Sequence, residues 1–293
     1  MPCINNVNTK GDLQMTQGKF EWNIEILNHD TVRGGFKFAV FDFDGTISLI
    51  REGWQQIMMP YFTEELMATP GGREKPVQEL SDFAREFIFI NTGKQTIYQC
   101  IQLADEIKKL GGSPQNPMTY KDEYSRRLLE RIQHRLDGLK SGALDPRDHV
   151  VPGSFELLDG LKDRGVEMYL ASGTDEEYVL MESALLGVDK YFGKHIYGAQ
   201  SDYKNFSKKI VIDRLIKDNN LHGSKLLGFG DGYVEIENVK SVGGFTCGVA
   251  SDEANRCGID EWKRNRLLCS HADIIVPDYT HVNELLEYIF KEG

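Results

Sequence analysis

The sequence has no apolar run that approaches the roughly 20 residues of a membrane-spanning helix. Its first residues, MPCINNVNTKGD, also lack the basic start and the apolar segment of a secretory signal peptide. These two absences predict a cytoplasmic protein with no membrane partner.

Cysteine is scarce, and its pattern excludes two classes of site. The five cysteines are odd in number and scattered, and no two of them have C-x-x-C spacing: Cys3, Cys100, Cys247, Cys257 and Cys269. This pattern argues against a zinc site or a redox motif and favours reduced thiols.

Positive charge is also in short supply. The 293 residues include 34 Lys and Arg against 45 Asp and Glu, which gives a formal net charge of -11. A phosphate backbone is bound by clustered basic residues, so we expect no nucleic-acid partner. A small phosphorylated ligand stays compatible with this charge, because it needs only one local cation or metal.

The sequence does contain two kinds of segment, one typical of buried strands and one typical of helices. The chain has 293 residues, which is enough for one large domain or two of ordinary size, and 40% of them are hydrophobic. Residues 36–41 form a short apolar run typical of a buried strand, whereas residues 49–148 show helical spacing in roughly four segments. The last of these carries one apolar stripe on a charged helix, formed by Leu128, Leu129, Ile132 and Leu136.

From about residue 149 strands alternate with helices, which indicates βαβ units around a parallel sheet. We therefore predict an α/β fold with a Rossmann-like parallel sheet, helices on both faces, and an inserted all-helical cap. The core comprises residues 1–48 and 149–293, of which 1–35 form an N-terminal extension, and the cap comprises 49–148. Within the extension, FEWNIEIL at 20–27 alternates as an edge strand does.

Two carboxylates, Asp42 and Asp44, directly follow the apolar run FAVF. Two acids this close at the end of a buried strand repel each other and lose hydration, unless a cation compensates them. Further polar residues follow or flank later strands of the predicted sheet. These are Ser172, which ends a predicted strand in YLASGT, Lys208 and Lys209 at a helix start in SKKIVI, and Asp231, which ends another strand in LLGFGDGYVEIE and is followed by Glu235. The carboxyl edge of an open parallel sheet is where ligands bind.

These four motifs, in this order, resemble the haloacid dehalogenase superfamily of phosphotransferases. Its pattern is Asp-x-Asp-x-Thr, then Ser or Thr, then Lys, then Gly-Asp with a further acid. The resemblance covers about residues 36–48 and 150–280. The helical block resembles the cap that one branch inserts after the first motif. Phosphoglycolate phosphatases and β-phosphoglucomutases are similar to it in layout.

The resemblance implies a role for each matching residue. Asp42 corresponds to the nucleophile that takes the phosphoryl group, and Asp44 to the general acid and base. Mg²⁺ is the implied cofactor, with Asp42, Asp44, Asp231 and Glu235 as the metal-binding residues. The implied phosphate-binding residues are Thr46, Ser172 and Gly173.

Either of two neighbouring lysines can serve as the lysine of the third motif. Lys208 is preferred because residues three, four and seven positions later are apolar, whereas Lys209 has Asp213 at one of those positions. Taken singly, each motif has an ordinary explanation: Asp-Gly pairs form turns, Ser172 caps a helix, and Lys208 starts a solvated helix. Only their joint occurrence favours a phosphoryl-transfer site.

The cap offers candidates for substrate selection. Arg51, Glu52 and Trp54 follow the first motif and lie within reach of a substrate. We predict Arg51 as a substrate-binding residue, with a surface salt bridge as the alternative, and Trp54 either contacts the substrate or packs in the core of the cap helices. The stretch NTGKQT at 91–96 forms a polar tip with Lys94 and Gln95. It is not a Walker A loop, because position 88 is isoleucine where that motif has glycine.

The leading hypothesis is a Mg²⁺-dependent hydrolase of a small phosphomonoester, such as a phosphorylated sugar, acting as a monomer or a homodimer. A phosphomutase uses the same aspartyl-phosphate and is not separated from it by these motifs. A dehalogenase has no use for Asp44 or a metal, and a non-catalytic metabolite-binding protein has no need of the intact acids. The charged excursion 251–268 is either a loop and helix at the edge of the core or a contact for another subunit.

Overall fold

The computed structural model describes residues 19–21, 24–200 and 207–291. Within these residues, one sheet of eight strands has the order β1-β2-β8-β7-β6-β3-β4-β5. The strands are β1 (Lys19–Glu21), β2 (Ile24–Ile26), β3 (Phe38–Phe41), β4 (Glu167–Asp175), β5 (Ile196–Ala199), β6 (Leu226–Gly230), β7 (Phe245–Val249) and β8 (Ile274–Val276).

The six strands from β8 to β5 pair in parallel, which confirms the predicted Rossmann-like sheet. The edge beside β8 is different, because β2 pairs with it antiparallel and β1 pairs antiparallel with β2. The single edge strand expected over 20–27 is therefore wrong in one respect. Residues 20–21 and 24–26 belong to two short strands, Leu27 lies beyond the end of β2, and positions 22–23 lie outside the described residues.

Helices cover both faces of the sheet, as the alternating sequence predicts. In the central strand β3, Ala39 and Phe41 join one core cluster while Val40 joins another on the opposite face. The first face packs against α5 (Ser154–Asp163), α6 (Glu176–Leu186), α7 (Asp189–Phe192) and α11 (Val282–Phe290). The second packs against α8 (Lys208–Asp218), α9 (Tyr233–Ser241) and α10 (Glu261–Cys269).

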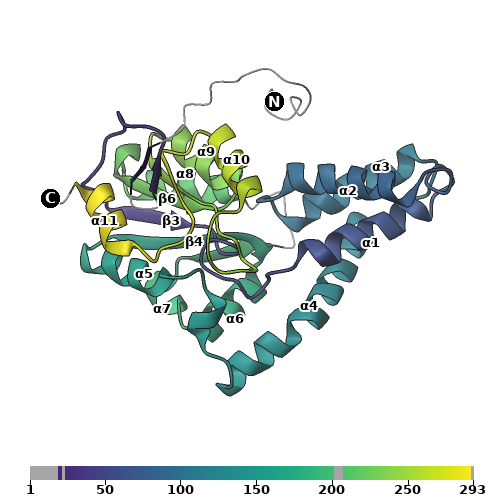
Figure 1. Cartoon of the computed structure of the whole chain (residues 1–293), viewed down its shortest axis with the longest axis horizontal. Coiled ribbons are helices and arrows are strands. Elements are labelled where there is room, and N and C mark those ends of the chain that lie inside the picture. The colour runs from purple at the N-terminus through teal and green to yellow at the C-terminus, as the bar shows by residue number, and fades with distance from the viewer. Residues whose placement is uncertain (1–18, 22–23, 201–206, 292–293) are drawn as a thin grey trace.

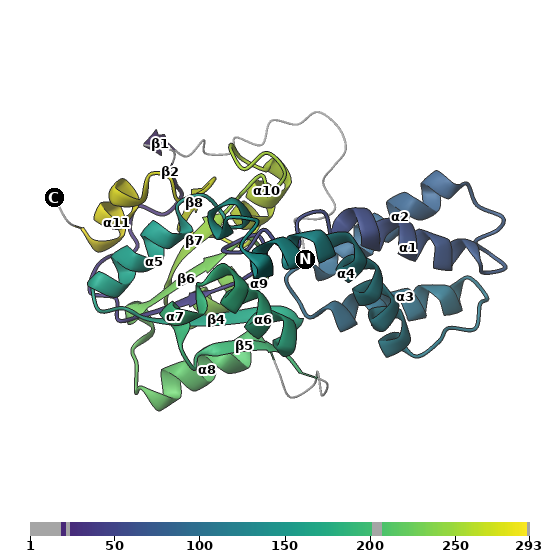
Figure 2. The same cartoon turned by 90° about the horizontal axis from the view of Figure 1, so that it is seen from below.

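The inserted helices project from one end of the sheet in both views (Figure 1, Figure 2). They are α1 (Gln55–Met67), α2 (Val77–Asn91), α3 (Thr96–Lys109) and α4 (Pro117–Ser141), followed by the 3-10 turn η1 (Pro146–His149). A second such turn, η3 (Gly223–Lys225), precedes β6. In α4 the predicted stripe faces inward, since Leu128, Ile132 and Leu136 are buried and Leu129 is partly buried.

Local sequence sets the ends of α4. The side chain of Asn116 accepts a hydrogen bond from the backbone N–H of Met118, which satisfies one free donor of the first turn. Gly142 ends the helix in the left-handed conformation, with φ of 73°. Within the described residues, no helix has both the length and the apolar character that a membrane crossing requires.

Candidate active site

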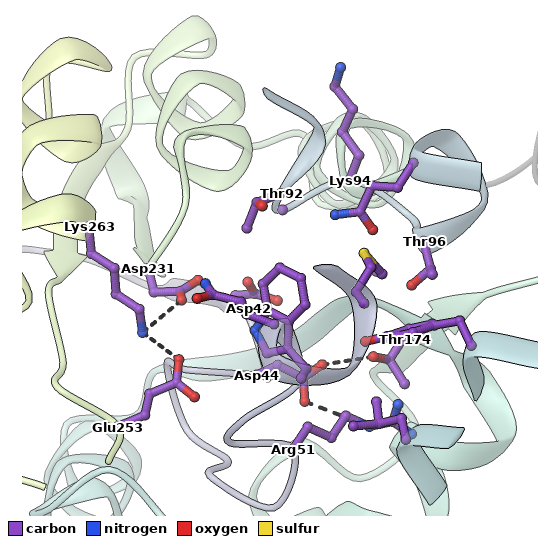
Figure 3. A pocket seen from close by; sticks show the side chains of 18 of the residues that line it. Asp42, Asp44, Arg51, Thr92, Lys94, Thr96, Thr174, Asp231, Glu253 and Lys263 are labelled. Atoms are coloured by element: carbon purple, nitrogen blue, oxygen red, sulfur yellow. Dashed lines mark hydrogen bonds and ion pairs between the residues drawn. The ribbon is translucent and has the colours of Figure 1, made fainter. Parts of the chain in front are cut away.

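Three neighbouring strands, β4, β3 and β6, bring Ser172, Asp42 and Asp231 to one edge of the sheet. Figure 3 shows Asp42, Asp44 and Asp231 close together there. Asp42 directly follows β3, and its backbone N–H donates to the carbonyl of Phe229 in β6. Asp231 directly follows β6, and Ser172 lies within β4. The parallel pairing of these strands is therefore what gathers residues that are up to 189 positions apart in the sequence.

A glycine allows the two strand ends to approach each other. Gly45 has φ of 75°, a conformation that side chains disfavour. A Cβ atom at this position would lie 2.4 Å from Oδ2 of Asp231. The turn after Asp44 therefore needs glycine both for its backbone angle and for the space that Asp231 fills.

Lys208, and not Lys209, lies against Asp42. Its Nζ atom is 2.8 Å from Oδ1 of Asp42, and it also forms an ion pair with Glu235. Ser207 begins α8 by accepting a hydrogen bond from the N–H of Ile210, so Lys208 occupies the first turn. Lys209 pairs with Asp213 on the exposed side of the helix.

Burial and charge act together on this cluster. Loss of hydration and the nearby charge of Glu235 raise the pKa of Asp42 well above its ordinary value, although Lys208 opposes the shift. Burial lowers the pKa of Lys208, but Asp42 and Glu235 outweigh it and raise the pKa overall. Lys208 therefore stays an ammonium, and the acids around it exceed the positive charge it supplies.

The carboxylate of Asp44 is held by hydroxyl groups from β4. The hydroxyl of Thr174 donates to Oδ2 of Asp44 at 2.8 Å, and that of Ser172 lies 3.4 Å from the same oxygen. The Thr174 hydroxyl was not among the predicted site residues. The strand predicted to end at Ser172 continues as β4 to Asp175, with a register irregularity against β5. In an extended strand, residues two apart share a face.

Arg51 lies between this acid and a second one that the sequence did not reveal. Its guanidinium makes hydrogen bonds to both carboxylate oxygens of Glu182 in α6, and its Nε atom is 4.0 Å from Oδ1 of Asp44. Glu182 is fully buried. Burial raises the pKa of Glu182, and Arg51 opposes that rise. This ion pair ties the chain entering the cap to the core.

On the opposite side, a second buried lysine contacts Asp231. Lys263 in α10 is 3.0 Å from Oδ2 of Asp231 and 2.7 Å from Oε1 of Glu253. Neither Lys263 nor Glu253 was a predicted site residue. The only sequence signal was the charged excursion 251–268, which the structure shows to be a loop and the helix α10 beside β7 and α9.

A cavity of about 100 Å³ lies between the core residues and the cap. Core residues that line it include Asp42, Asp44, Gly173, Lys208 and Asp231, and cap residues include Trp54, Met58, Lys94 and Tyr124. The cap tip reaches the core closely, because a Cβ atom at Gly173 would lie 2.7 Å from the carbonyl oxygen of Lys94.

Other predicted residues do not line the cavity. Thr46 and Glu235 are buried, and neither is among the residues that line the cavity. Glu52 pairs with Arg135 of α4 at 2.6 Å, which directs it to the cap helices. Gln95 is buried at the start of α3.

The donor set fits a hard divalent cation. Mg²⁺ is usually bound through one or two carboxylates and retained waters, and Asp42 and Asp231 can supply such oxygens. Glu235 is also buried, and its Oε2 atom has no hydrogen-bond partner among the described residues. A divalent cation would also offset the mutual repulsion of these acids. Within the same residues, no three His, Cys, Asp or Glu side chains lie together as a ready metal cluster.

The chain matches one protein-family model. Residues 36–243 match the family described as haloacid dehalogenase-like hydrolase, which covers more than half of the chain. No curated protein matches the sequence.

Solved structures share the fold at low sequence identity. A predicted phosphoglycolate phosphatase from Haemophilus somnus 129PT has a TM-score of 0.56 and 16% identity, with 86% of this chain and 98% of that chain covered. β-Phosphoglucomutase from Clostridium difficile has a TM-score of 0.56 and 15% identity, covering 88% and 98%. A HAD family hydrolase from Deinococcus radiodurans R1, with bound phosphate and sodium, has a TM-score of 0.50 and 13% identity, covering 87% and 96%.

Proposed function

The chain belongs to the haloacid dehalogenase-like hydrolases, and on that premise we propose that it hydrolyses a small phosphomonoester with the help of Mg²⁺. The observation that carries this proposal is the contact of Lys208 with Asp42 at the end of β3, beside Asp231. A buried carboxylate with an ammonium 2.8 Å away suits a nucleophile that must receive a phosphoryl group whose charge needs neutralising.

Two displacements account for hydrolysis. In the first, a carboxylate oxygen of Asp42 attacks phosphorus, the bond from phosphorus to the leaving oxygen breaks, and Asp44 gives its proton to that oxygen. In the second, Asp44 takes a proton from a water molecule, which attacks phosphorus and releases inorganic phosphate from Asp42. The hydroxyl of Thr174 holds the Asp44 carboxyl in place for both proton transfers.

Asp42 and Asp231 would bind Mg²⁺ through their carboxylates and Asp44 through its backbone carbonyl, with Glu235 accepting from a metal-bound water. When bound, the metal supplies positive charge against the phosphoryl oxygens. Lys208 supplies the other fixed charge, because its pKa is raised by Asp42 and Glu235 against the effect of burial.

Hydrogen-bond donors for the phosphoryl oxygens come from residues around the turn. We assign this role to Ser172, to the backbone N–H of Gly173 and to Thr46. The hydroxyl oxygen of Thr46 is buried and has no hydrogen-bond partner among the described residues. Arg51, 11% exposed in its side chain and lining the cavity, would contact the substrate beyond the phosphoryl group.

The cap, which we assign to residues 49–148, would select the substrate. The substrate that we propose is a small metabolite such as a phosphorylated sugar, bound in the cavity between the cap and the core. Its walls combine polar and aromatic side chains, including Trp54, Gln55, Thr96 and Tyr124. Such a lining suits a polar molecule with a limited carbon skeleton.

Release of inorganic phosphate from a panel of phosphorylated metabolites, with Mg²⁺ and with a chelator, tests this function. We expect Mg²⁺-dependent turnover that the Asp42→Asn substitution abolishes. Asp213→Asn, which changes an exposed acid on α8, is the matched control and should retain full activity. Turnover in Asp42→Asn equal to that of the wild type would contradict the role of Asp42 as the nucleophile.

The same experiment separates hydrolysis from phosphoryl transfer within a sugar. The phosphatase-like and mutase-like structures have the same TM-score against this chain, so the fold favours neither. Incubation with hexose 1-phosphates should yield inorganic phosphate. Conversion to hexose 6-phosphates without phosphate release would identify a mutase instead.

A further inference from the structure

Lys263, the buried lysine of α10 that contacts Asp231, has no role in the function proposed above. The Lys263 ammonium contacts Oδ2 of Asp231 at 3.0 Å and Oε1 of Glu253 at 2.7 Å, and both contacts are visible in Figure 3. The side chain of Lys263 is 6% exposed, so these contacts lie inside the molecule. Asp231 is one of the two carboxylates that the proposed function assigns to Mg²⁺.

The position of this ammonium is fixed by its surroundings. Its third contact is the hydroxyl oxygen of Ser251, at 3.1 Å, and Ser251 in turn donates to the carbonyl of Gly45 at 2.7 Å. All three N–H groups of the ammonium therefore have an oxygen acceptor. The side chain of Asp260 begins α10 by accepting from the backbone N–H of Lys263, which sets where the lysine leaves the helix.

The arrangement repeats, at β6, the one found at β3. Asp42 is held by Lys208, which pairs with Glu235, and Asp231 is held by Lys263, which pairs with Glu253. All three residues of the first set belong to the four motifs, and so does Asp231 of the second. Lys263 and Glu253 lie beyond residue 243, where the match to the family model ends. The two partners of Asp231 therefore come from outside the matched region.

We propose that Lys263 competes with the divalent cation for the carboxylate of Asp231, and that Glu253 sets the strength of this competition by holding the ammonium. The inference rests on the Mg²⁺ site of the proposed function. Its physical basis is that an ammonium 3.0 Å from a ligand oxygen repels an arriving cation and must give up its own attraction to that oxygen. Glu253 and Ser251 retain Lys263 when Asp231 is shared with the metal.

Calorimetric titration of the full chain with Mg²⁺ tests the competition without any measurement of turnover. Lys263→Met should bind Mg²⁺ at least about tenfold more tightly, because Asp231 is freed and the repulsion is removed. Glu253→Gln should bind it more weakly than the wild type, because the ammonium loses its other anion and rests more fully on Asp231. The two substitutions thus move the affinity in opposite directions.

The double variant Lys263→Met/Glu253→Gln separates direct competition from a general effect of charge. It has the same net charge as the wild type but no ammonium at Asp231, so competition predicts tighter binding of Mg²⁺. Lys240→Met is the matched control, because Lys240 pairs with the buried Asp273 at 2.7 Å, outside the cavity. Its Mg²⁺ affinity should equal that of the wild type. Circular dichroism establishes that each variant is folded.

Mg²⁺ affinity in the folded double variant equal to or weaker than that of the wild type would overturn the competition, and so would tighter binding by Glu253→Gln. Should Lys263→Met fail to fold, the double variant and Glu253→Gln still decide the matter. Failure of Mg²⁺ to bind any variant would overturn the inference together with the proposed metal site. Equal binding by all variants, with Mg²⁺-dependent phosphate release intact, would overturn the inference alone.

Discussion

Lys208 approaches Asp42 to 2.8 Å, whereas its sequence neighbour Lys209 faces Asp213 on the exposed side of the same helix. Residue 208 points inward because Val211, Ile212 and Leu215, three, four and seven positions later, are buried against the sheet. One residue of offset on a helix thus decides which ammonium reaches the carboxylate.

Replacing each lysine by methionine should therefore have very different effects. Lys208→Met removes the charge that faces Asp42, so kcat/KM for phosphate release should fall by about 10²- to 10³-fold. Lys209→Met should leave kcat/KM unchanged. Thermal melting of both variants controls for folding, since Lys208→Met also leaves Glu235 without its ion-pair partner. A large loss in Lys209→Met with none in Lys208→Met would reverse the assignment.

The identity of this lysine could be predicted because the spacing of apolar residues on a helix is a local property of the sequence. The strands that end at Asp42 and Asp231 were predictable for the same reason, from short apolar runs. The contacts of Arg51 with Glu182 and of Asp231 with Lys263 were not. Each contact joins segments that are far apart in the sequence. Their relative placement depends on tertiary packing, which the local spacing of apolar residues does not reveal.

Thr174 was missed for a different reason. A strand ending at Ser172 would place residue 174 near a helix start, where its hydroxyl would have no fixed direction. The structure instead pairs Asp175 with Ala199 of β5, so the strand continues and Thr174 lies on the same face as Ser172. The cross-strand pairing, which the sequence does not state, decides the direction of this hydroxyl.

If Asp44 is the general acid, the effect of replacing it on kcat/KM should depend on the leaving group of the substrate. Asp44→Asn cannot protonate an alkoxide, so kcat/KM for an alkyl phosphate should fall by about 10²- to 10⁴-fold. An aryl phosphate such as p-nitrophenyl phosphate needs no proton to leave, and its kcat/KM should change little. The ratio of the two constants is the measurement. Thr174→Val, which removes a 2.8 Å hydrogen bond to Asp44, should shift the ratio in the same direction by less. Equal losses on both substrates would contradict the acid role.

The ion pair of Arg51 with Glu182 allows a structural role to be separated from substrate binding. Arg51→Met leaves a fully buried carboxylate unpaired and should lower the free energy of unfolding by about 3–5 kcal/mol. The double variant Arg51→Met/Glu182→Met removes that charge as well and should regain most of the stability in urea unfolding. Its KM should nevertheless stay elevated, because the substrate contact is still missing. Recovery of a wild-type KM in the double variant would show that Arg51 acts only through the fold.

Closure of the cap onto the core should depend on Gly173. An alanine Cβ there would lie 2.7 Å from the carbonyl oxygen of Lys94, so Gly173→Ala should force the cap tip away from the core. We expect kcat/KM to fall by up to about 10²-fold, since small misplacements of positioning groups are costly, with little change in melting temperature.

Gly187→Ala is the control for Gly173→Ala. Its Cβ meets no atom within 4 Å, but its φ of 69° is strained for alanine. It should lower stability by about 1 kcal/mol and leave activity intact. The opposite pattern would argue against the cap contact.

His149, in the turn where the chain returns from the cap to the core, should make stability depend on pH. Burial, and then the charge of Arg135, lower the pKa of His149 below its ordinary value of 6.5. The unfolded chain therefore binds a proton at a higher pH than the folded protein does. This group costs no stability above pH 6.5, and its cost grows as the pH falls through 6.5 towards the lower folded-state pKa. His149→Gln cannot take up the proton, so the difference in urea midpoint between pH 7.5 and pH 5.5 should be smaller than in the wild type.

His195, whose pKa is lowered by burial against the opposing charge of Glu167, should act in the same direction. The double substitution His149→Gln/His195→Gln should narrow the difference further, whereas an unchanged difference in His149→Gln would show that Arg135 and burial do not disfavour its charged form.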